Sequence, residues 1–431
     1  MKILVAGSDA NALVAALTLQ KEGHQVEVLQ GEHLGGISSL LPANPLAPDV
    51  ANSLELGLSL QIVGRTGVSA AGDTVNLKLR EISGAVSERD QEKWREFVAI
   101  LNKASEIWRA LFQEGPVQSV VARWREFGHR QSMEVLRLPW QSLSVLLDDW
   151  FESDLLKGTL AAAALRGSRQ GPYSPGSAFL LLQRWARGEV FGRATVGLEK
   201  LKELSEAAGV LFHSDSLLSF ETALGDVNSV KTKSGVTMSA DVYLTTEDPA
   251  LTLENRVGIA KCDPDHLEIS KHWDTRSTTL VARCEPSDNW GASMVNFCSD
   301  LESLERAYDP TKYGSSSEEP FAEFDSASGL LYVQHLRGEN LQDKVKAICA
   351  AHGLGEPTEF RAPSELEADF GVTGGHLFGG EKSLWQSYSL RERLQNPFSN
   401  LYLCGASTGP GDYSGVSGQS VAKLVAQLSL V

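Results

Sequence analysis

The sequence has no long apolar run. No stretch of about 18 uninterrupted apolar residues, the length that a membrane-spanning helix needs, occurs among its 431 residues. The chain passes from Met1 and Lys2 directly into a five-residue apolar stretch, without the apolar core and cleavage site of a secretory signal. We therefore expect neither a transmembrane segment nor secretion.

Cysteine is scarce and is not patterned. The five cysteines form no C-x-x-C pair and no repeated spacing, and no two histidines show the H-x-x-x-H spacing of a metal site. We expect no metal centre, no disulfide framework and a cytoplasmic location. Cys404 ends an apolar stretch, and we expect it to be a small core residue without a catalytic role.

Clusters of basic residues are also missing. The formal net charge is −16, and neutralising nucleic-acid phosphates requires gathered Lys and Arg. Ser, His and Asp are scattered without a nucleophile elbow, so hydrolase chemistry has no support either. The charge therefore argues against a nucleic-acid partner.

The composition is that of a globular protein. Hydrophobic residues make up 42% and charged residues 22% of a chain that is too long for one ordinary core. We expect two domains, with room for one to be interleaved in the other. No internal repeat is present.

The first 30 residues predict a β-α-β unit. An apolar run at 2–6 is followed by Gly7, by apolar positions at helical spacing over 12–22, and by a second apolar run at 26–29. Such a unit pairs two parallel strands through a right-handed crossover. The fold class is therefore α/β with a Rossmann-like dinucleotide-binding sheet.

Other segments predict a helical middle and a second region of sheet. Apolar residues recur at spacings of three and four from 94 to 111, which indicates the core-facing side of a long helix. The polar stretch 305–328 is expected to be a mobile surface segment. The remaining expected helices are 145–165, 177–187 and 417–428, and the remaining expected strands are 210–212, 217–221, 229–233, 241–244 and 400–404.

The turn after the first strand is a degenerate phosphate loop. Aligned to G-x-G-x-x-G, it keeps Gly7 but has Asp9 and Ala12 at the second and third glycine positions. Ala12 is a tolerated variant. Asp9 would repel a diphosphate by about 1 to 4 kcal/mol at separations near 4 Å, or it could cap the helix instead.

The second strand ends on Gln30, where an acidic residue normally binds the ribose hydroxyls. The amide oxygen of Gln30 can still accept a hydrogen bond, without help from charge. On this evidence alone, a β-α-β unit without a ligand remains a fair alternative.

The carboxyl-terminal part carries a more specific pattern. Gly-Gly-His-Leu-Phe-Gly-Gly-Glu at 374–381 precedes Leu-Tyr-Leu-Cys-Gly-Ala-Ser-Thr-Gly-Pro-Gly at 401–411 by about 20 residues. This pair resembles the ending of phytoene desaturases, carotenoid isomerases and the related pyridine nucleotide-disulfide oxidoreductase domain-containing proteins, within the flavin amine oxidase superfamily. Further landmarks in the same order are 34–36, 54–58, 206–210, 240–243 and 248–249.

The resemblance implies FAD and a set of residues near it. In that family the last loop passes the flavin, and the following helix points its amino end at the cofactor. The implied cofactor-binding residues, together with Gly7, Asp9, Ala12 and Gln30, are Gly35, Gly36, Gly405, Pro410, Gly411, Gly415, Val416 and Gly418.

The chain departs from the family pattern at several of these places. The final loop is two residues longer than P-G-G-G-V-x-G and carries Asp412. Ala194 and Thr195 stand where two glycines are usual, and Ile37 stands where an arginine or lysine is usual. Several cofactor contacts are therefore altered together.

His376 and Glu381 of the G-G-H motif are the candidates for lining the flavin or the substrate tunnel. The alternative is that the glycines only make turns and His376 is a satisfied polar group. Trp273, Trp290 and the apolar run 278–282 resemble the substrate-domain sheet of the family, but core packing is the favoured role for them.

The leading hypothesis is an FAD-dependent oxidoreductase of the desaturase, dehydrogenase or isomerase type that acts on an apolar small molecule. The alternative is a flavin-free protein of the same fold that serves as a binding or scaffold protein, and a nicotinamide dehydrogenase comes third. We expect the dinucleotide-binding domain at 1–70, 190–250 and 360–431, and the substrate or cap domain at 71–189 and 251–359.

Overall fold

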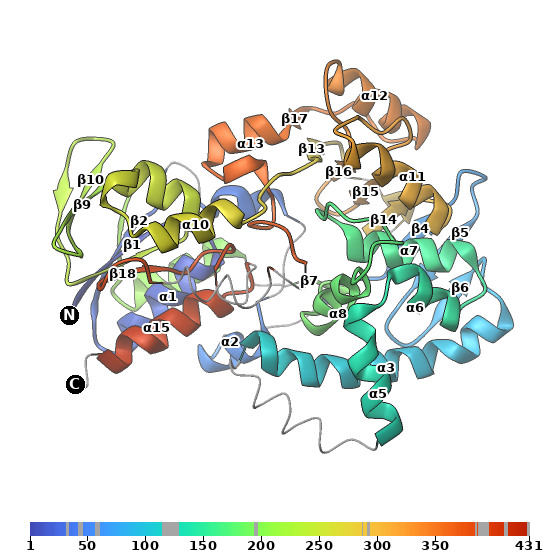
Figure 1. Cartoon of the computed structure of the whole chain (residues 1–431), viewed down its shortest axis with the longest axis horizontal. Helices are drawn as coiled ribbons and strands as arrows, with labels where there is room; N and C mark the ends of the chain where they lie inside the picture. Colours follow the sequence, from blue (N-terminus) through green and yellow to red (C-terminus); the bar gives the residue numbers. More distant parts are fainter. Residues whose placement is uncertain are drawn as a thin grey trace.

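Two sheets of different construction organise the chain. The computed structural model describes residues 1–31, 34–41, 46–56, 61–113, 129–193, 197–286, 288–290, 294–383, 386, 396–408 and 413–428. Figure 1 shows α1 and α15 beside the strands of the first sheet, and a group of helices that includes α3, α7 and α8 on the other side of the molecule.

The first sheet is parallel throughout and has the order β18-β12-β1-β2-β8. All of its strands except β8 at the edge are largely buried on both faces, which explains their almost continuous apolar runs. In β1, Ile3 and Val5 pack towards α1 and α15, whereas Leu4 and Ala6 pack towards a small antiparallel sheet. The strands of the parallel sheet are β1 (Lys2–Ala6), β2 (Gln25–Leu29), β8 (Leu211–His213), β12 (Val242–Thr245) and β18 (Leu401–Leu403).

The order of these strands creates a switch point. From β1 the chain crosses through α1 (Ala10–Lys21) to β2 on one side, while β12 pairs with β1 on the other side. Ligands of open α/β sheets bind outside the carboxyl ends of the strands at such a point. The predicted β-α-β opening and the α/β class are confirmed.

The two faces of the parallel sheet are covered differently. One face carries α1, α9 (Leu198–Ala207) and α15 (Val416–Leu428). The other face packs against β9 (Leu217–Ala223) and β10 (Asp226–Thr232), which pair with β11 (Thr237–Met238) in a separate antiparallel sheet. The strands predicted at 217–221 and 229–233 exist, but they lie in this second layer.

The eight-stranded sheet has the order β17-β13-β16-β15-β14-β4-β5-β6 and is antiparallel except between β14 and β4. It packs on one side against the apolar residues of α12 (Leu341–Ala351). Its strands are β4 (Arg65–Val68), β5 (Thr74–Leu77), β6 (Ile82–Gly84), β13 (Thr279–Arg283), β14 (Met294–Phe297), β15 (Ala322–Asp325), β16 (Leu330–Gln334) and β17 (Glu359–Arg361).

Helices of the middle segment bury a large core against β5 and β6, as their apolar spacing predicts. Trp94 and Phe97 are both about 1% exposed at the centre of this core. These helices are α3 (Glu88–Gln113), α5 (His129–Arg137), α6 (Leu143–Trp150), α7 (Asp154–Leu165) and α8 (Ala178–Ala186), with α11 (Leu301–Lys312) alongside. The other described elements are α2 (Pro48–Ser53), α10 (Pro264–His272), α13 (Pro363–Phe370), the two-stranded pair β3 (Gln61–Ile62) with β7 (Gly192–Arg193), the π-helical turn η3 (Leu251–Gly258), and the short 3-10 turns η1 (Gly36–Leu40), η2 (Leu138–Trp140), η4 (Ile259–Lys261), η5 (Asp288–Trp290) and η6 (Thr373–Gly375).

The expectation of a mobile surface segment at 305–328 is wrong. Residues up to 312 belong to α11, and all four residues of β15 are buried. Composition misled here because Glu323 of β15 is an interior carboxylate that binds Arg65 and Arg166, both also buried. Composition does not distinguish charged residues that are paired in the interior from charged residues in a solvated loop.

The domain boundaries stay a prediction. The strands of the parallel sheet all fall in the ranges expected for the dinucleotide-binding domain, whereas β4, also inside the range 1–70, pairs with β14 of the eight-stranded sheet. Among the described helices, none combines the length and the apolar character that crossing a membrane requires. Cys404 is fully buried in the core between the parallel sheet and its helices, as expected.

Candidate functional site

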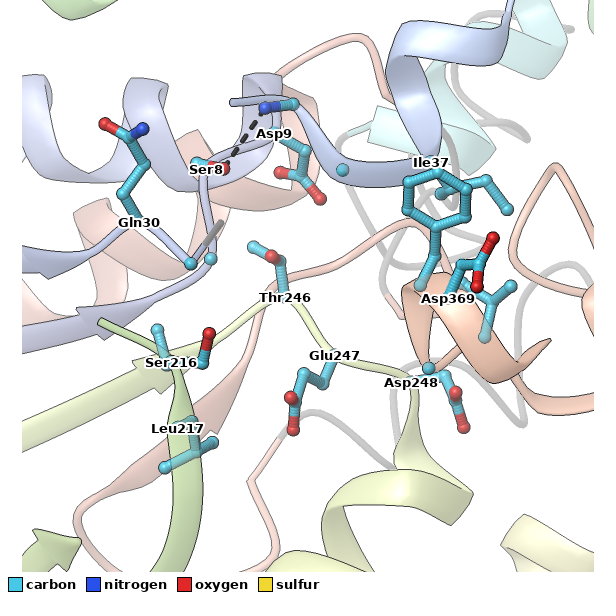
Figure 2. A pocket seen from close by; sticks show the side chains of 18 of the residues that line it. Ser8, Asp9, Gln30, Ile37, Ser216, Leu217, Thr246, Glu247, Asp248 and Asp369 are labelled. Carbon is cyan, nitrogen blue, oxygen red and sulfur yellow. Dashed lines mark hydrogen bonds between the residues drawn. The ribbon is translucent and has the colours of Figure 1, made fainter. Parts of the chain in front are cut away.

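A cleft of about 500 Å³ lies at the carboxyl ends of the parallel strands. Residues that directly follow β1, β2 and β12 line it, together with the segment that joins β8 to β9. Figure 2 shows Gln30 on one side of the start of α1, and Thr246, Glu247 and Asp248 following one another along the segment after β12. The volume of the cleft is within the range of about 300 to 1,000 Å³ that is typical of small-molecule sites.

Gly7 and Ser8 form the turn between β1 and α1. Gly7 has a φ of +130°, and a β-carbon there would lie 2.0 Å from Oγ1 of Thr246, so only glycine fits between the two strand ends. The Ser8 hydroxyl accepts a hydrogen bond of 3.1 Å from the amide of Gly35 (Figure 2). Gly35 also has a positive φ, of +82°. The predicted residues Gly7, Gly35 and Gly36 therefore come together at one wall of the cleft.

Asp9 caps α1, which was one of the two roles predicted for it. Its Oδ1 accepts a hydrogen bond of 3.0 Å from the amide of Ala12, and the side chain also contacts Thr246. Burial raises the pKa of Asp9 to about 6, although the hydrogen bonds from Ala12 and Thr246 oppose the rise. The carboxylate thus occupies amides at the positive end of α1 that an anionic ligand would otherwise use.

The far end of the cleft is less acidic. Gln30 lines this end of the cleft, and the backbone amide of Gln30 donates a hydrogen bond to the carbonyl of His213. Ser216, Leu217 and Lys233 line the same region, and Lys233 donates its backbone amide to Ser216 over 2.9 Å. Hydroxyl, amide and ammonium groups are therefore available here for hydroxyl-bearing parts of a ligand.

The segment after β12 contributes two carboxylates that are already satisfied. Glu247 accepts from both Nε and Nη2 of Arg256 at 2.8 to 3.1 Å. Asp248 accepts from the amide of Leu251 and from the amide and hydroxyl of Thr373 at 2.7 to 3.0 Å. Burial raises the pKa of both carboxyl groups. Asp248 ties the end of β12 to the G-G-H segment.

The opposite wall comes from α13 and the residues after it. Arg361 forms an ion pair with Asp369, and Phe370 and Val372 complete the wall. Ile37 also lines the cleft, and it is 5% exposed. An apolar side chain therefore lies at the position where the sequence resemblance led us to expect a cation.

A narrow extension continues from the cleft towards the G-G-H segment. Its volume is about 20 Å³, and Thr246, Asp248, Val372 and Tyr413 line both it and the wide cleft. The other residues that line the extension are Thr275, Thr373, His376, Gly379, Gly380, Ala406 and Ser407. The candidate His376 therefore faces this extension, and its Nδ1 accepts a hydrogen bond from the amide of Phe378.

The candidate Glu381 lines neither cavity. Its carboxylate accepts hydrogen bonds from the Ser168 hydroxyl at 2.7 Å, from the Arg169 amide at 2.8 Å and from the Gln170 amide group at 3.3 Å. This arrangement fastens the loop after α7 to the G-G-H segment. The contacts of Glu381 are those of a structural residue.

The other implied cofactor residues lie in packing positions or outside the described part of the chain. Ala12 is fully buried in α1, and Gly418 of α15 lies against the carbonyl of Asn11, where a β-carbon would approach to 2.0 Å. A β-carbon at Gly405 would lie 2.2 Å from the carbonyl of Thr246. Gly415 and Val416 pack against residues of α1 and α2. Pro410, Gly411, Asp412, Ala194 and Thr195 fall outside the described residues.

Reasoning from sequence missed much of the cleft. Thr246 and Glu247 follow a strand that was predicted, so the rule that locates sites at the carboxyl ends of parallel strands would have found them. Arg256, Arg361 and Asp369 come from separate elements and carry no local signal. Tyr413 lines both cavities, but a single aromatic residue after a glycine-rich loop carries no local signal of that position.

Comparisons with curated proteins find distant relatives. Pyridine nucleotide-disulfide oxidoreductase domain-containing protein 2 of Rattus norvegicus is 27% identical over 362 residues, which are 68% of this chain and 61% of that protein. The Mus musculus protein of the same name is 24% identical over an alignment that covers 98% of this chain and 92% of that protein. The match to the rat protein thus spans less than two thirds of its length. No family model matches the chain.

Comparisons with solved structures identify the fold. An oxidoreductase from Methanosarcina mazei aligns with this chain at a TM-score of 0.56 and 14% identity. The alignment covers 99% of this chain and 100% of that protein. Putrescine oxidase bound to putrescine matches over 99% of both chains at a TM-score of 0.58 and 13% identity. The chain therefore has the mixed α/β fold with a Rossmann-like parallel sheet, as predicted, and shares this fold with the two solved structures.

Proposed function

We propose that the protein is an FAD-dependent oxidoreductase. The observation that carries the proposal is the cleft at the switch point of the parallel sheet, because a glycine turn, a helix amino terminus and Gln30 meet there in the arrangement of a dinucleotide site. The fold comparisons support an oxidoreductase, and the resemblance of the G-G-H motif supports FAD.

The residues of the cleft fit the adenosine diphosphate half of FAD with one departure. Gln30 and Ser216 would bind ribose hydroxyls, and Gly7 lets the backbone approach a diphosphate at the start of α1. The departure is Asp9, which holds the amide of Ala12. Neutral Asp9 would remove the repulsion, and its pKa of about 6 places that state within reach.

Bound FAD would supply an acceptor for a hydride or for an electron pair. The chain's own contribution would be to orient the ligand and exclude water. The G-G-H segment brings Leu377 and Phe378 into an apolar cluster with Val281 and Met294 of the eight-stranded sheet. These side chains are buried and line neither cavity, so our proposal of an apolar substrate of the kind that desaturases, dehydrogenases or isomerases take rests on the sequence resemblance, with His376 of the extension as the candidate catalytic residue.

The location and the redox setting complete the proposal. All five cysteines are free thiols, and Cys284, Cys298, Cys349 and Cys404 are buried. Free thiols suit a reducing compartment. On this ground we propose the cytoplasm.

Incubation with FAD tests this function. We expect titration calorimetry of the purified chain to give dissociation constants in the micromolar range for both FAD and ADP, about 8 kcal/mol of binding free energy. Absence of binding by both FAD and ADP would rule out the proposal.

A flavin-free binding protein of the same fold is the second candidate. It is favoured by the internal capping of α1 by Asp9 and by the small volume of the extension, about 20 Å³. This candidate requires a chain that binds ADP but takes up no FAD, even at millimolar concentration. Reduction of bound FAD by an added substrate would exclude it.

A further inference from the structure

We infer that Tyr413 sets the length of ligand that the cleft admits. With its side chain in the observed position, the cleft takes an adenine nucleotide of the length of ADP, and a flavin ring enters only when the ring of Tyr413 is displaced. This inference rests on the proposed function, because it concerns the same cleft, and it names the residue that separates the two halves of that site.

The position of Tyr413 carries the argument. Of the four residues that line both cavities, Tyr413 is the only aromatic one, and it is 6% exposed. It belongs to the apolar cluster that contains Phe378 and Ala406, on the side of the extension. The ring therefore stands where the wide cleft narrows.

The two volumes show what the narrowing does. A space of about 20 Å³ is just above the 10 to 15 Å³ or so that one water molecule needs. A three-ring flavin is many times larger. The wide cleft, at about 500 Å³, has room for an adenine nucleotide.

The surroundings of Tyr413 keep its phenol group protonated. Burial raises the pKa of its phenol well above the usual value of 10, and the nearby carboxylates of Asp9 and Asp248 add to the rise. The hydroxyl thus stays protonated in the field of these two carboxylates. Its other neighbours at the narrowing, Thr246 and Val372, are uncharged.

The position of Tyr413 affects the affinity for FAD relative to the affinity for ADP. FAD contains ADP, so an open site would bind FAD more tightly than ADP through the added contacts of the flavin half. If the ring of Tyr413 must first leave its apolar cluster, that displacement offsets those contacts. We expect the wild-type chain to bind FAD and ADP with dissociation constants within about threefold of each other.

Titration calorimetry of ADP and FAD with wild type, Tyr413→Ala and Tyr413→Phe tests the inference. Tyr413→Ala should tighten FAD at least about tenfold and leave ADP within about threefold. Tyr413→Phe, which keeps the ring, should behave as wild type. Phe370→Ala is the matched aromatic control, because Phe370 lines the wide cleft alone, and it should weaken both ligands equally. Circular dichroism and thermal unfolding verify that each variant is folded.

The outcomes separate this inference from the proposed function. If neither ligand binds the wild type, both the proposed function and this inference fail. If the wild type binds FAD at least about tenfold more tightly than ADP, the inference fails and the proposed function stands, whether or not Tyr413→Ala folds. If Tyr413→Ala folds and changes the two ligands equally, the inference also fails.

Discussion

A carboxylate buried at the start of α1 costs the folded protein stability at neutral pH. The pKa of Asp9 rises from 3.8 to about 6 on folding, so the folded chain holds its proton more tightly than the unfolded chain. The folded state is therefore penalised as pH rises from about 4 to about 6, and the full penalty remains above about 6. The hydrogen bond to Ala12 reduces this penalty without removing it.

Asp9→Asn should therefore stabilise the protein in a pH-dependent manner. Asparagine is as good a helix cap as aspartate but has no charge to desolvate. The free energy of unfolding should rise by at most about 3 kcal/mol above about pH 6 and by little below about pH 4. Urea denaturation over this range gives the difference. Asp263→Asn, at the exposed cap of α10, is the control. A gain in stability for Asp9→Asn that is equal at every pH would contradict the prediction.

Asp9 should also link ligand binding to protons. An ionised Asp9 opposes a diphosphate and a neutral one does not, so ADP affinity should fall as pH rises through about 6, by about fivefold or more for a repulsion of at least about 1 kcal/mol. Calorimetry in buffers of different ionisation enthalpy should detect proton uptake on binding at about pH 7. Asp9→Asn should flatten the pH profile; an unchanged profile would place the titrating group elsewhere.

At the scale of elements, the contact between α1 and α15 depends on one glycine. Gly418 lets α15 approach the backbone of α1, and a β-carbon would overlap the carbonyl of Asn11. The sequence predicted both helices from their apolar spacing, yet it could not assign this glycine to packing. A glycine near a cofactor and a glycine at a helix crossing have the same local pattern.

Gly418→Ala should destabilise the fold. Overpacking of a close contact costs about 1 to 3 kcal/mol, because the two helices must separate. Gly355→Ala is the control, since nothing lies within 4 Å of a β-carbon there. Urea denaturation of the two variants should show a loss for Gly418→Ala alone. Equal effects would contradict the packing role.

At the scale of the whole molecule, a buried ion cluster joins three distant segments. Glu323 of β15 binds Arg65 of β4 and Arg166 after α7, and all three side chains are at most 3% exposed. Burial alone would raise the pKa of Glu323, but the two guanidinium groups lower it to about 2. The stability that this ionised group contributes is present above pH 4.5 or so and is lost as pH falls towards 2.

Glu323→Gln should be strongly destabilising. It removes the charge that balances two buried arginines, a change that costs about 3 to 5 kcal/mol when one partner of a buried pair is lost. Glu221→Gln, which removes an exposed pair with Lys231, should change stability by less than about 1 kcal/mol. Thermal and urea unfolding measure both. A loss similar to that of the exposed pair would show that the cluster is dispensable.

The local sequence determined the strand, glycine turn, helix and second strand at the amino terminus, and with them the α/β class. These elements depend on short-range apolar spacing and on backbone preferences, which a sequence displays directly. The capping role of Asp9 was within reach for the same reason, since it needs only its own helix.

Only the tertiary structure decided the rest of the site. Arg361, Asp369 and Tyr413 line the same cleft as the turn at Gly7, although they lie hundreds of residues away along the chain. The burial of Glu323 likewise depended on two arginines from other elements, so its stretch read as surface. Long-range pairing leaves no local periodicity, and for that reason the walls of the cleft became visible only in the folded chain.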